Sequence, residues 1–245
     1  MSIKAKFLSL ANKAALVPLY LLTTALLRRS KVGKIAVFDC DDFDWVAKLE
    51  ESTEEIQKEL NALLSHRDEI PPFQIIQPDY EQLTTDKRWK TFVFYGYGTK
   101  IHDNCEKCPA TVRAIEKVPG LRTAMFSIVE PKKKIPMHTG PYKGMLRYHL
   151  ALKIPGDGSE CGIEIDGKTF RWQEGKSLLF DDTFSHCAWN DSDETRAVLF
   201  LGIKRPLGPI LNLLNTCVIE LIRWSDSTTN AVENLKQFNN QQAQR

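Results

Sequence analysis

Seven short stretches rich in strand-forming residues follow one another in the second half of the chain, and no other feature of the sequence restricts the fold as strongly. Turn-forming residues separate them, including residues 155–158 (Pro-Gly-Asp-Gly) and the hairpin dipeptide Asp166-Gly167. Short strands at this spacing predict a mainly β fold, a sandwich or a double-sheet jelly roll. The predicted strands cover residues 123–130, 144–154, 161–166, 168–172, 176–182, 185–190 and 196–204.

Flanking α-helices are expected on both sides of this β region. Apolar residues at helical spacing among many charges predict amphipathic helices before and after it, and an alternating aromatic stretch predicts one further strand. A polar tail is expected to be disordered because it has too few apolar residues to bury. The predicted helices cover residues 44–66, 109–118 and 208–224, the additional strand residues 88–98, and the tail residues 237–245.

A chain of 245 residues with 42% hydrophobic content can bury one substantial core. We therefore expect one catalytic-size domain with appendages. Residues 1–35 form a hydrophobic and basic N-terminal segment, residues 36–206 the domain with a helical N-terminal part, and residues 207–245 a C-terminal amphipathic helix and polar tail.

The N-terminal segment contains an uncharged tract, residues 14–27, between two groups of basic residues. Spanning a membrane takes about 20 apolar residues, and Pro18 interrupts this shorter tract. A secretory signal is also disfavoured, since no small-residue cleavage site follows. Two interpretations stay open: a helix buried against the domain, or a segment that lies in a membrane interface.

The charges of the chain nearly cancel, with 33 Lys and Arg against 31 Asp and Glu and a formal net charge of +2. A balance of this kind provides no global field that would favour nucleic acid. We therefore expect no DNA- or RNA-binding function.

Six cysteines are too few for a disulfide scaffold in a chain of this length, which favours a reduced, intracellular setting. Cys105 and Cys108 form a C-x-x-C pair. A zinc site would need a second pair of ligands, and a thioredoxin-like site would need a βαβ context, and neither follows in the sequence. The favoured interpretation is a loop that leads into the helix beginning at Pro109.

Residues 135–152 resemble a strand but contain two histidines and an arginine. Because successive side chains of a strand point to opposite faces, Arg147 and His149 share one face while Leu146, Tyr148 and Leu150 share the other. The apolar face is expected to pack, and the basic face to meet a ligand or a partner.

Three histidines lie in the β region: His138, His149 and His186. Arg196 follows His186 after a polar turn, at the start of an apolar strand. If His186 and Arg196 flank a hairpin, their side chains face one cavity from adjacent antiparallel strands. Imidazoles suit Fe(II), and a buried guanidinium suits a carboxylate, so the set fits a non-haem iron site with a dicarboxylate co-substrate.

The segments MHTGPYKGMLRYHLALKIP and FDDTFSHCAWNDSDETRAVLFLGIKRP resemble the aspartyl/asparaginyl β-hydroxylase family of Fe(II)/2-oxoglutarate dioxygenases, over about residues 88–206. The motifs H-x-G-P, L-R-x-H-L and F-D-D-x-x-x-H and the late arginine occur in the family's order. The resemblance implies a double-stranded β-helix (jelly-roll or cupin-like) core, with residues 36–206 as the dioxygenase domain.

The resemblance also implies a role for six residues. His138 and His186 are the catalytic and metal-binding residues and would hold Fe(II). Arg196 would pair with the distal carboxylate of 2-oxoglutarate. Arg147 and His149 would hold the other carboxylate, and Ser127 matches a family serine that contacts the co-substrate. O2 is the second co-substrate.

The chain departs from the usual facial triad at one position. That triad has Asp or Glu two residues after the first histidine, where this chain has Gly140. The peptidyl hydroxylases are similar in having glycine there, with water completing the coordination. Asp181 or Asp182 could orient such a water or His186, or could serve only the turn.

The substrate stays open between two classes. The framework and the hydrophobic N-terminus are similar to the bacterial lipid A acyl-chain 2-hydroxylases, whereas Gly140 is similar to the peptidyl Asp/Asn hydroxylases. We favour hydroxylation of a lipid acyl chain at a C–H next to a carbonyl-bearing carbon, at the cytoplasmic face of a membrane or in the cytoplasm. A cupin-like protein that binds a ligand without turnover is the remaining alternative.

Overall fold

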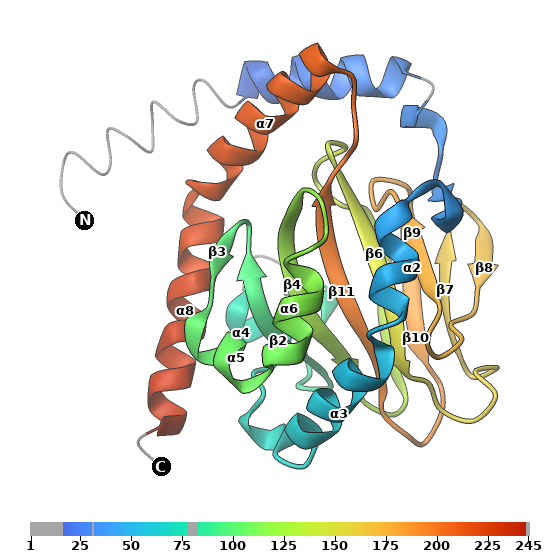
Figure 1. Cartoon of the computed structure of the whole chain (residues 1–245), viewed down its shortest axis with the longest axis vertical. Helices are drawn as coiled ribbons and strands as arrows, with labels where there is room; N and C mark the ends of the chain where they lie inside the picture. Colours follow the sequence, from blue (N-terminus) through green and yellow to red (C-terminus); the bar gives the residue numbers. More distant parts are fainter. Residues whose placement is uncertain (1–16, 31, 78–82, 244–245) are drawn as a thin grey trace.

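The computed structural model describes residues 17–30, 32–77 and 83–243. Two antiparallel sheets face each other, with helices on the outer side of the larger sheet and further helices against part of its inner side, where the smaller sheet does not cover it (Figure 1). The larger sheet has the order β1-β9-β6-β11-β4-β2-β3 and the smaller the order β5-β10-β7-β8. The strands of the larger sheet are β1 (Val37–Phe38), β2 (Trp89–Gly96), β3 (Thr99–Lys100), β4 (Leu121–Val129), β6 (Met145–Lys153), β9 (Ser177–Phe180) and β11 (Arg196–Lys204), and those of the smaller are β5 (Lys133–His138), β7 (Cys161–Ile165), β8 (Lys168–Phe170) and β10 (His186–Asn190).

The mainly β, cupin-like prediction is confirmed, and each of the seven predicted strands has a counterpart. Residues 135–152, however, do not form one strand. They contribute to β5 in one sheet and β6 in the other, joined by a loop that includes Gly140, Pro141 and Gly144. Proline lacks the backbone donor that a continuing ladder would require, so the chain leaves one sheet here and enters the other.

The predicted hairpin at Asp166-Gly167 is confirmed. It joins β7 to β8, and both residues have positive φ angles, 51° and 74°, as a two-residue type I′ turn requires. The predicted pairing of the His186 and Arg196 strands is wrong, because β10 pairs with β5 and β7 whereas β11 pairs with β4 and β6. A polar turn can connect strands of two different sheets as well as two neighbouring strands of one sheet.

Helices cover the outer face of the larger sheet and bury the apolar side of β6. The single helix predicted over residues 44–66 is in fact two, because Thr53 Oγ1 donates to the Glu50 carbonyl (2.6 Å) and a new helix begins there. The short helix at Pro109 is confirmed, and a one-and-a-half-turn helix replaces the loop expected before it. The helical elements before the β region are η1 (Val32–Lys34), η2 (Cys40–Asp42), α2 (Asp44–Glu50), α3 (Thr53–Leu64), η3 (Arg67–Glu69), α4 (Phe73–Ile76), α5 (His102–Lys107) and α6 (Pro109–Ile115).

The chain ends in two helices, α7 (Pro209–Arg223) and α8 (Asp226–Ala243). The first confirms the predicted amphipathic helix. The prediction of a disordered tail over residues 237–245 is wrong up to Ala243, because these residues continue α8 and Asn239 Nδ2 donates to Asn104 Oδ1 (3.1 Å). Tertiary contacts at a few positions stabilise a helix whose composition is polar.

Residues 17–29 of the N-terminal segment are helical, and residues 1–16 of the predicted segment lie outside the described part. One side of this helix packs on the domain, with Leu27 buried and the Tyr20 hydroxyl donating to the Pro141 carbonyl. The other side exposes Val17 and Leu21. Within the described residues, none of the helices has both the length and the hydropathy to cross a bilayer.

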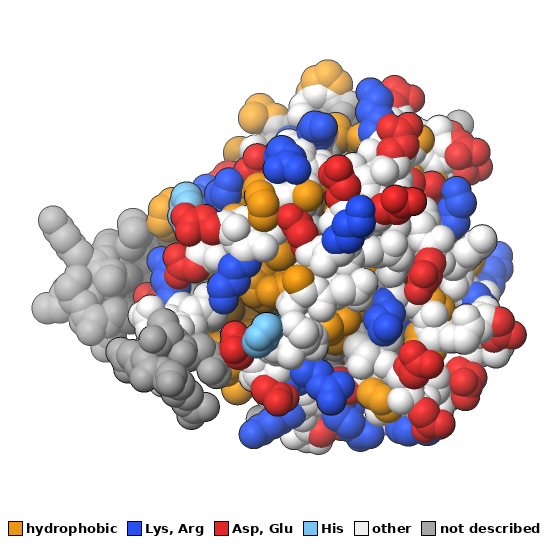
Figure 2. All heavy atoms as spheres, turned by 60° about the horizontal axis from the view of Figure 1, so that its bottom comes forward, with side chains coloured by type: hydrophobic (Ala, Val, Ile, Leu, Met, Phe, Trp, Pro, Cys, Tyr) orange, Lys and Arg blue, Asp and Glu red, His pale blue; other side chains and the backbone are white. Residues whose placement is uncertain are grey.

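Positive and negative side chains alternate over the face of the molecule drawn in Figure 2, and hydrophobic side chains lie in a hollow between them. This distribution agrees with the net charge of +2 and shows no single-sign patch on that face. The three-part division of the chain stays a prediction.

Candidate active site

A pocket of about 170 Å³ lies between the two sheets. All six predicted site residues line it, and they come from both sheets: His138 on β5, His186 on β10, and the other four on β4, β6 and β11. Side chains from five different strands therefore converge because the facing sheets both direct alternate residues inward. The remaining four are Ser127, Arg147, His149 and Arg196.

His138 and His186 are opposite each other on paired strands, and their ring centroids lie 4.1 Å apart. The Nδ1 of His138 contacts the Pro136 carbonyl (2.8 Å), and the Nδ1 of His186 contacts the Phe184 carbonyl (2.9 Å). A carbonyl can only accept, so each Nδ1 must carry the proton, which leaves each Nε2 with a free lone pair. This is the tautomer that a metal-binding imidazole needs.

Burial lowers the pKa of His186, and the neighbouring His138 lowers it further. Both effects disfavour the imidazolium. The neutral ring that results is the form that can donate a lone pair.

Arg196 is 2% exposed, yet its Nε has no hydrogen-bond partner and no carboxylate among the described residues forms an ion pair with it. The ring of Trp172 covers the guanidinium at 4.3 Å. Burial lowers the pKa of Arg196 to about 10, so the group stays charged at neutral pH. A buried cation without an anion is costly, which makes this end of the pocket a site for an anionic ligand.

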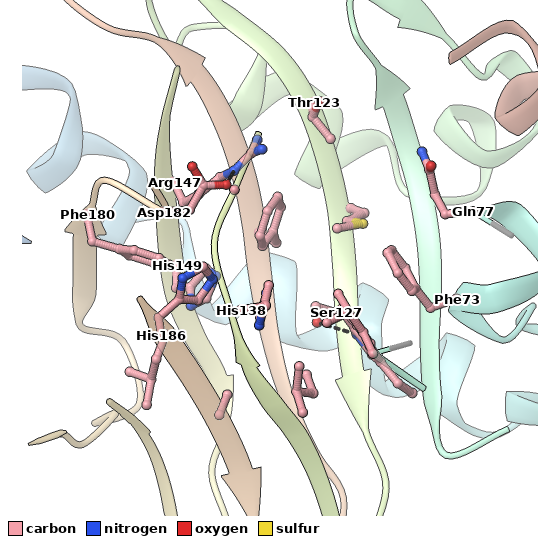
Figure 3. A pocket seen from close by; sticks show the side chains of 18 of the residues that line it. Phe73, Gln77, Thr123, Ser127, His138, Arg147, His149, Phe180, Asp182 and His186 are labelled. Carbon is pink, nitrogen blue, oxygen red and sulfur yellow. Dashed lines mark hydrogen bonds and ion pairs between the residues drawn. The ribbon is translucent and has the colours of Figure 1, made fainter. Parts of the chain in front are cut away.

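His149 lies beside Arg196 and has no hydrogen-bond partner for either ring nitrogen. Burial, then the charge of Arg196, lowers its pKa well below the usual value for histidine. It is therefore a neutral imidazole whose N–H can donate to an acceptor in the pocket. Figure 3 shows His138, His149 and His186, from three different strands, within the same part of the pocket.

Arg147 and Asp182, which line the same pocket as His138 and His186, form an ion pair with 2.6 Å between Arg147 Nε and Asp182 Oδ2 (Figure 3). Asp182 is 6% exposed, and its other oxygen, Oδ1, has no partner. A Cβ placed on Gly140 would overlap all three atoms of this carboxylate group. The Asp182 carboxylate thus lies in the space that the side chain of an H-x-D aspartate would enter.

Asp181, the other carboxylate considered from the sequence, is directed elsewhere. It is fully buried, pairs with Lys143 Nζ (2.8 Å) and also accepts from Arg205. These contacts join the loop after β9 to the β6 end of the β5–β6 connection and to the residue that follows β11. Asp181 is therefore a structural residue, and only Asp182 faces the pocket.

The aromatic residues of the pocket were not predicted as site residues, and Trp89 and Phe73 are two of them. Trp89 Nε1 donates to Ser127 Oγ (3.0 Å), and the Trp89 ring stacks on Phe73 with centroids 4.0 Å apart. Trp89 belongs to the predicted aromatic strand, whose alternation indicated a buried face but not what that face covers. Nothing in the local pattern around Phe73 indicated a site.

The donor set fits a metal held by two histidines. Among the side chains that the structure describes, no cluster of three or more His, Cys, Asp and Glu residues could hold a metal ion. His138 and His186 would therefore be the protein ligands, with Asp182 Oδ1 free to accept from a water beside them. The orphaned Arg196 and His149 provide the donors that a dicarboxylate requires.

The family model for aspartyl/asparaginyl β-hydroxylase matches residues 50–206. The ornithine lipid ester-linked acyl 2-hydroxylase of Rhizobium tropici is 41% identical over 212 residues, which is 86% of this chain and 75% of that protein. The human aspartyl/asparaginyl β-hydroxylase is 34% identical over 134 residues, which is 53% of this chain and 17% of that protein.

Solved structures that match part of this chain include the cupin domain of Schizosaccharomyces pombe Cnp3, with a TM-score of 0.34 and 9% identity over 49% of this chain and 67% of that one. The DMSP lyase DddQ from Ruegeria pomeroyi has a TM-score of 0.33 and 13% identity over half of each chain. The match to the hydroxylase family model, in contrast, spans most of the chain. It includes all six site residues that were predicted from the sequence and that line the pocket. The chain belongs to the aspartyl/asparaginyl β-hydroxylase family.

Proposed function

We propose that this protein is an Fe(II)- and 2-oxoglutarate-dependent dioxygenase that hydroxylates a lipid acyl chain at the carbon next to the carbonyl. The observation that carries the proposal is the combination, in one pocket, of two imidazoles with free Nε2 atoms and a buried arginine without a carboxylate. The two imidazoles suit Fe(II), and the buried arginine suits the carboxylate of an organic acid.

The residues of this chain position the reactants. His138 and His186 would hold the iron, and their backbone hydrogen bonds fix the ring orientation. Arg196 would bind the distal carboxylate of 2-oxoglutarate through its planar fork, beside the Ser127 hydroxyl. His149 and Arg147 would donate to the other carboxylate, and Asp182 would hold Arg147 and accept from water.

Bound iron would supply oxidation of 2-oxoglutarate to succinate and CO2 by O2, with the second oxygen atom inserted into a C–H bond of the substrate. The chain itself would place an apolar wall beside this chemistry. Phe180 and Phe200 pack at 5.1 and 5.2 Å from His149 and close the inner wall. Fixed donors beside this wall would orient the co-substrate without reorganisation during the reaction.

A lipid substrate is supported by the relative that spans most of the chain, whose name assigns it to the ester-linked acyl group of ornithine lipids. A peptidyl Asp or Asn is the second candidate, and Gly140 and the human relative favour it. The pocket lining favours the lipid, because beyond the histidines it is dominated by Phe73, Leu83, Trp89 and Met125. An acyl chain gains affinity from such walls, whereas a peptide carboxylate or amide would need polar partners there.

The test is a reaction of the purified chain with Fe(II), 2-oxoglutarate and O2, in which succinate and substrate mass are both followed. With ornithine lipid or another acyl lipid as substrate, we expect succinate in proportion to lipid that has gained one oxygen atom at C2. Succinate proportional to hydroxylated Asp- or Asn-containing peptide, with unchanged lipid, would select the second candidate. A chain that binds iron and 2-oxoglutarate but never forms succinate would be a non-catalytic binding protein.

The same proposal includes association with a membrane surface. The helix of residues 17–29 exposes Leu21 and Leu22, and α7 beside it exposes Ile210 and Leu213 at 79% and 66%. Basic residues at the end of the N-terminal helix flank these apolar side chains: Arg28, Arg29 and Lys34 are exposed. Exposed apolar side chains beside cations fit the interface of an anionic bilayer.

Co-flotation with vesicles of phosphatidylglycerol and phosphatidylethanolamine tests this association. The double substitution Ile210→Ser with Leu213→Ser should reduce the bound fraction, and Ile75→Ser, at an exposed site on α4, should not. High salt should weaken binding further, because it screens the basic residues. Equal flotation of all three proteins would exclude this surface as the membrane contact.

A further inference from the structure

A second cavity of about 80 Å³ adjoins the pocket of the candidate active site. Five residues line both: Phe73, Gln77, Tyr97, Thr123 and Met125. Figure 3 shows Phe73, Gln77 and Thr123 at the side of the pocket opposite His186 and Phe180. The second cavity, here called the side chamber, therefore lies against the end of the pocket that is away from His186.

The walls of the side chamber come from β2 and β4 on one side and from α4 and α8 on the other. They are mostly apolar, and no residue that the structure places in them carries a charge. Six buried residues form the cluster around the chamber: Ile76, Val93, Ile101, Met125, Ala231 and Leu235. A chamber of this composition, joined to a reactive centre, suits a hydrocarbon rather than a polar group.

Helix α8 closes the chamber, with Ala231, Val232 and Leu235 facing it. This helix lies beyond residue 206, where the match to the hydroxylase family model ends. The small side chain of Ala231 leaves space that a larger residue would fill. The depth of the chamber is thus set by an element outside the part that the family shares.

We infer that the side chamber binds the tail of the acyl chain, so that α8 determines which chain lengths the protein accepts. This inference rests on the proposed function and names the place of its substrate. With C2 beside His138 and His186, the carbons that follow run past Phe73 and Met125 into the chamber. Each methylene that enters contributes roughly fourfold in affinity.

The experiment measures turnover over a series of acyl lipids that differ only in chain length. Ala231→Phe fills the chamber and should lower kcat/KM for long chains relative to short ones by at least about tenfold, as expected for two or more displaced methylenes. Leu235→Ala enlarges the chamber and should shift the preference toward longer chains. Gln237→Phe, on the exposed side of the same helix, is the matched control and should keep the parent profile.

The readout is the ratio of kcat/KM for long and short chains, measured within one variant. A loss of stability lowers both values alike and so leaves this ratio unchanged. Formation of succinate in the absence of lipid should be equal in all four proteins, since none of these residues contacts the candidate metal ligands. The parent profile in both Ala231→Phe and Leu235→Ala would overturn the inference. Opposite shifts of the two variants would support it.

A binding measurement separates this inference from the proposed function. A fatty acid brominated at its terminal carbon should quench the fluorescence of Trp89, which stacks on Phe73 at the chamber entrance. Ala231→Phe should weaken this quenching and Gln237→Phe should not, whether or not the protein hydroxylates lipids. Equal quenching in both would show that the tail lies elsewhere, even if the parent hydroxylates C2 as proposed.

Discussion

Gly140 and Asp182 should behave as one unit, and Gly140→Ala tests this directly. The added Cβ would overlap the Asp182 carboxylate, so this side chain must rotate away. Rotation breaks its 2.6 Å contact with Arg147, whose side chain is 12% exposed. The substitution therefore removes an ion pair that water screens only weakly.

The magnitude follows from that contact. A hydrogen bond to a charged group contributes about 1.5–3 kcal/mol to the free energy of unfolding. In a domain of this size each kcal/mol changes Tm by roughly 2–4 °C, which gives a decrease of roughly 3–12 °C for Gly140→Ala. Fe(II) affinity should fall by roughly 10–100-fold, as for other groups that orient a metal site from outside its ligands.

The assay is a double-mutant cycle with urea unfolding and anaerobic Fe(II) titration as readouts. Gly140→Ala in the Asp182→Ala background should be nearly neutral, because the carboxylate that it would displace is no longer there. Gly208→Ala is the control, because its added Cβ meets no atom within 4 Å. Alanine is a poorer N-cap than glycine for α7, but it also lowers the conformational entropy of the unfolded chain, and these two effects on the free energy of unfolding oppose each other. Gly140→Asp with Asp182→Ala should recover Fe(II) affinity, since a carboxylate then enters the same space from position 140.

Additive effects of the two single substitutions would refute this reasoning. So would a Gly140→Ala protein with the parent Tm and the parent affinity for Fe(II). Either result would mean that Asp182 is not held where the structure has it.

Three further outcomes are expected. Arg196→Lys should raise the 2-oxoglutarate concentration needed for half-maximal succinate formation by at least about tenfold and leave the Fe(II) requirement unchanged, because lysine keeps the charge but loses the planar fork; an unchanged requirement would remove Arg196 from the co-substrate site. Asp181→Asn should lower the free energy of unfolding by about 3–5 kcal/mol in urea, because the buried cations Lys143 and Arg205 would both lose the charge of the Asp181 carboxylate; an effect below about 1 kcal/mol would contradict the structural role. His138→Ala should abolish Fe(II) binding in an anaerobic titration while circular dichroism stays that of the parent, and retained stoichiometric binding would exclude this histidine as a ligand.

The strands could be predicted because their signals are local. Alternation and turn residues such as Asp166-Gly167 are read within a few neighbours, and so is the division of β6 into a basic and an apolar face. That division held: Arg147 and His149 line the pocket, whereas Tyr148 and Leu150 lie in the core under the helices.

Sheet membership could not be predicted, because it depends on contacts between distant segments. The turn between His186 and Arg196 has the composition of a hairpin, yet the two strands that it joins lie in different sheets. The two residues reach one pocket across the gap between the sheets. The expected proximity was therefore right for a different structural reason.

The helix α8 shows the same limit for composition. The polar composition of residues 237–245 predicts disorder for the end of this helix, but the helix continues to Ala243, and Ala231 and Leu235 in its earlier turns contact apolar residues of β2, β4 and α4. Two apolar residues on one face of a helix can stabilise it when a sheet provides the apolar surface against which they pack. Such a partner is invisible in the sequence of the helix itself.

Asp181 and Asp182 could not be told apart in the sequence, since both follow β9 and both precede His186. In the structure one completes a buried network and the other reaches the pocket. The sequence indicated that a carboxylate was missing two residues after His138, at Gly140. The structure indicates that a carboxylate lies in that space after all, supplied from the loop after β9 and oriented by Arg147 on β6. Glycine at position 140 is then a requirement of the Asp182 carboxylate rather than the trace of a lost ligand, and a larger residue fits at position 140 only when Asp182 changes as well.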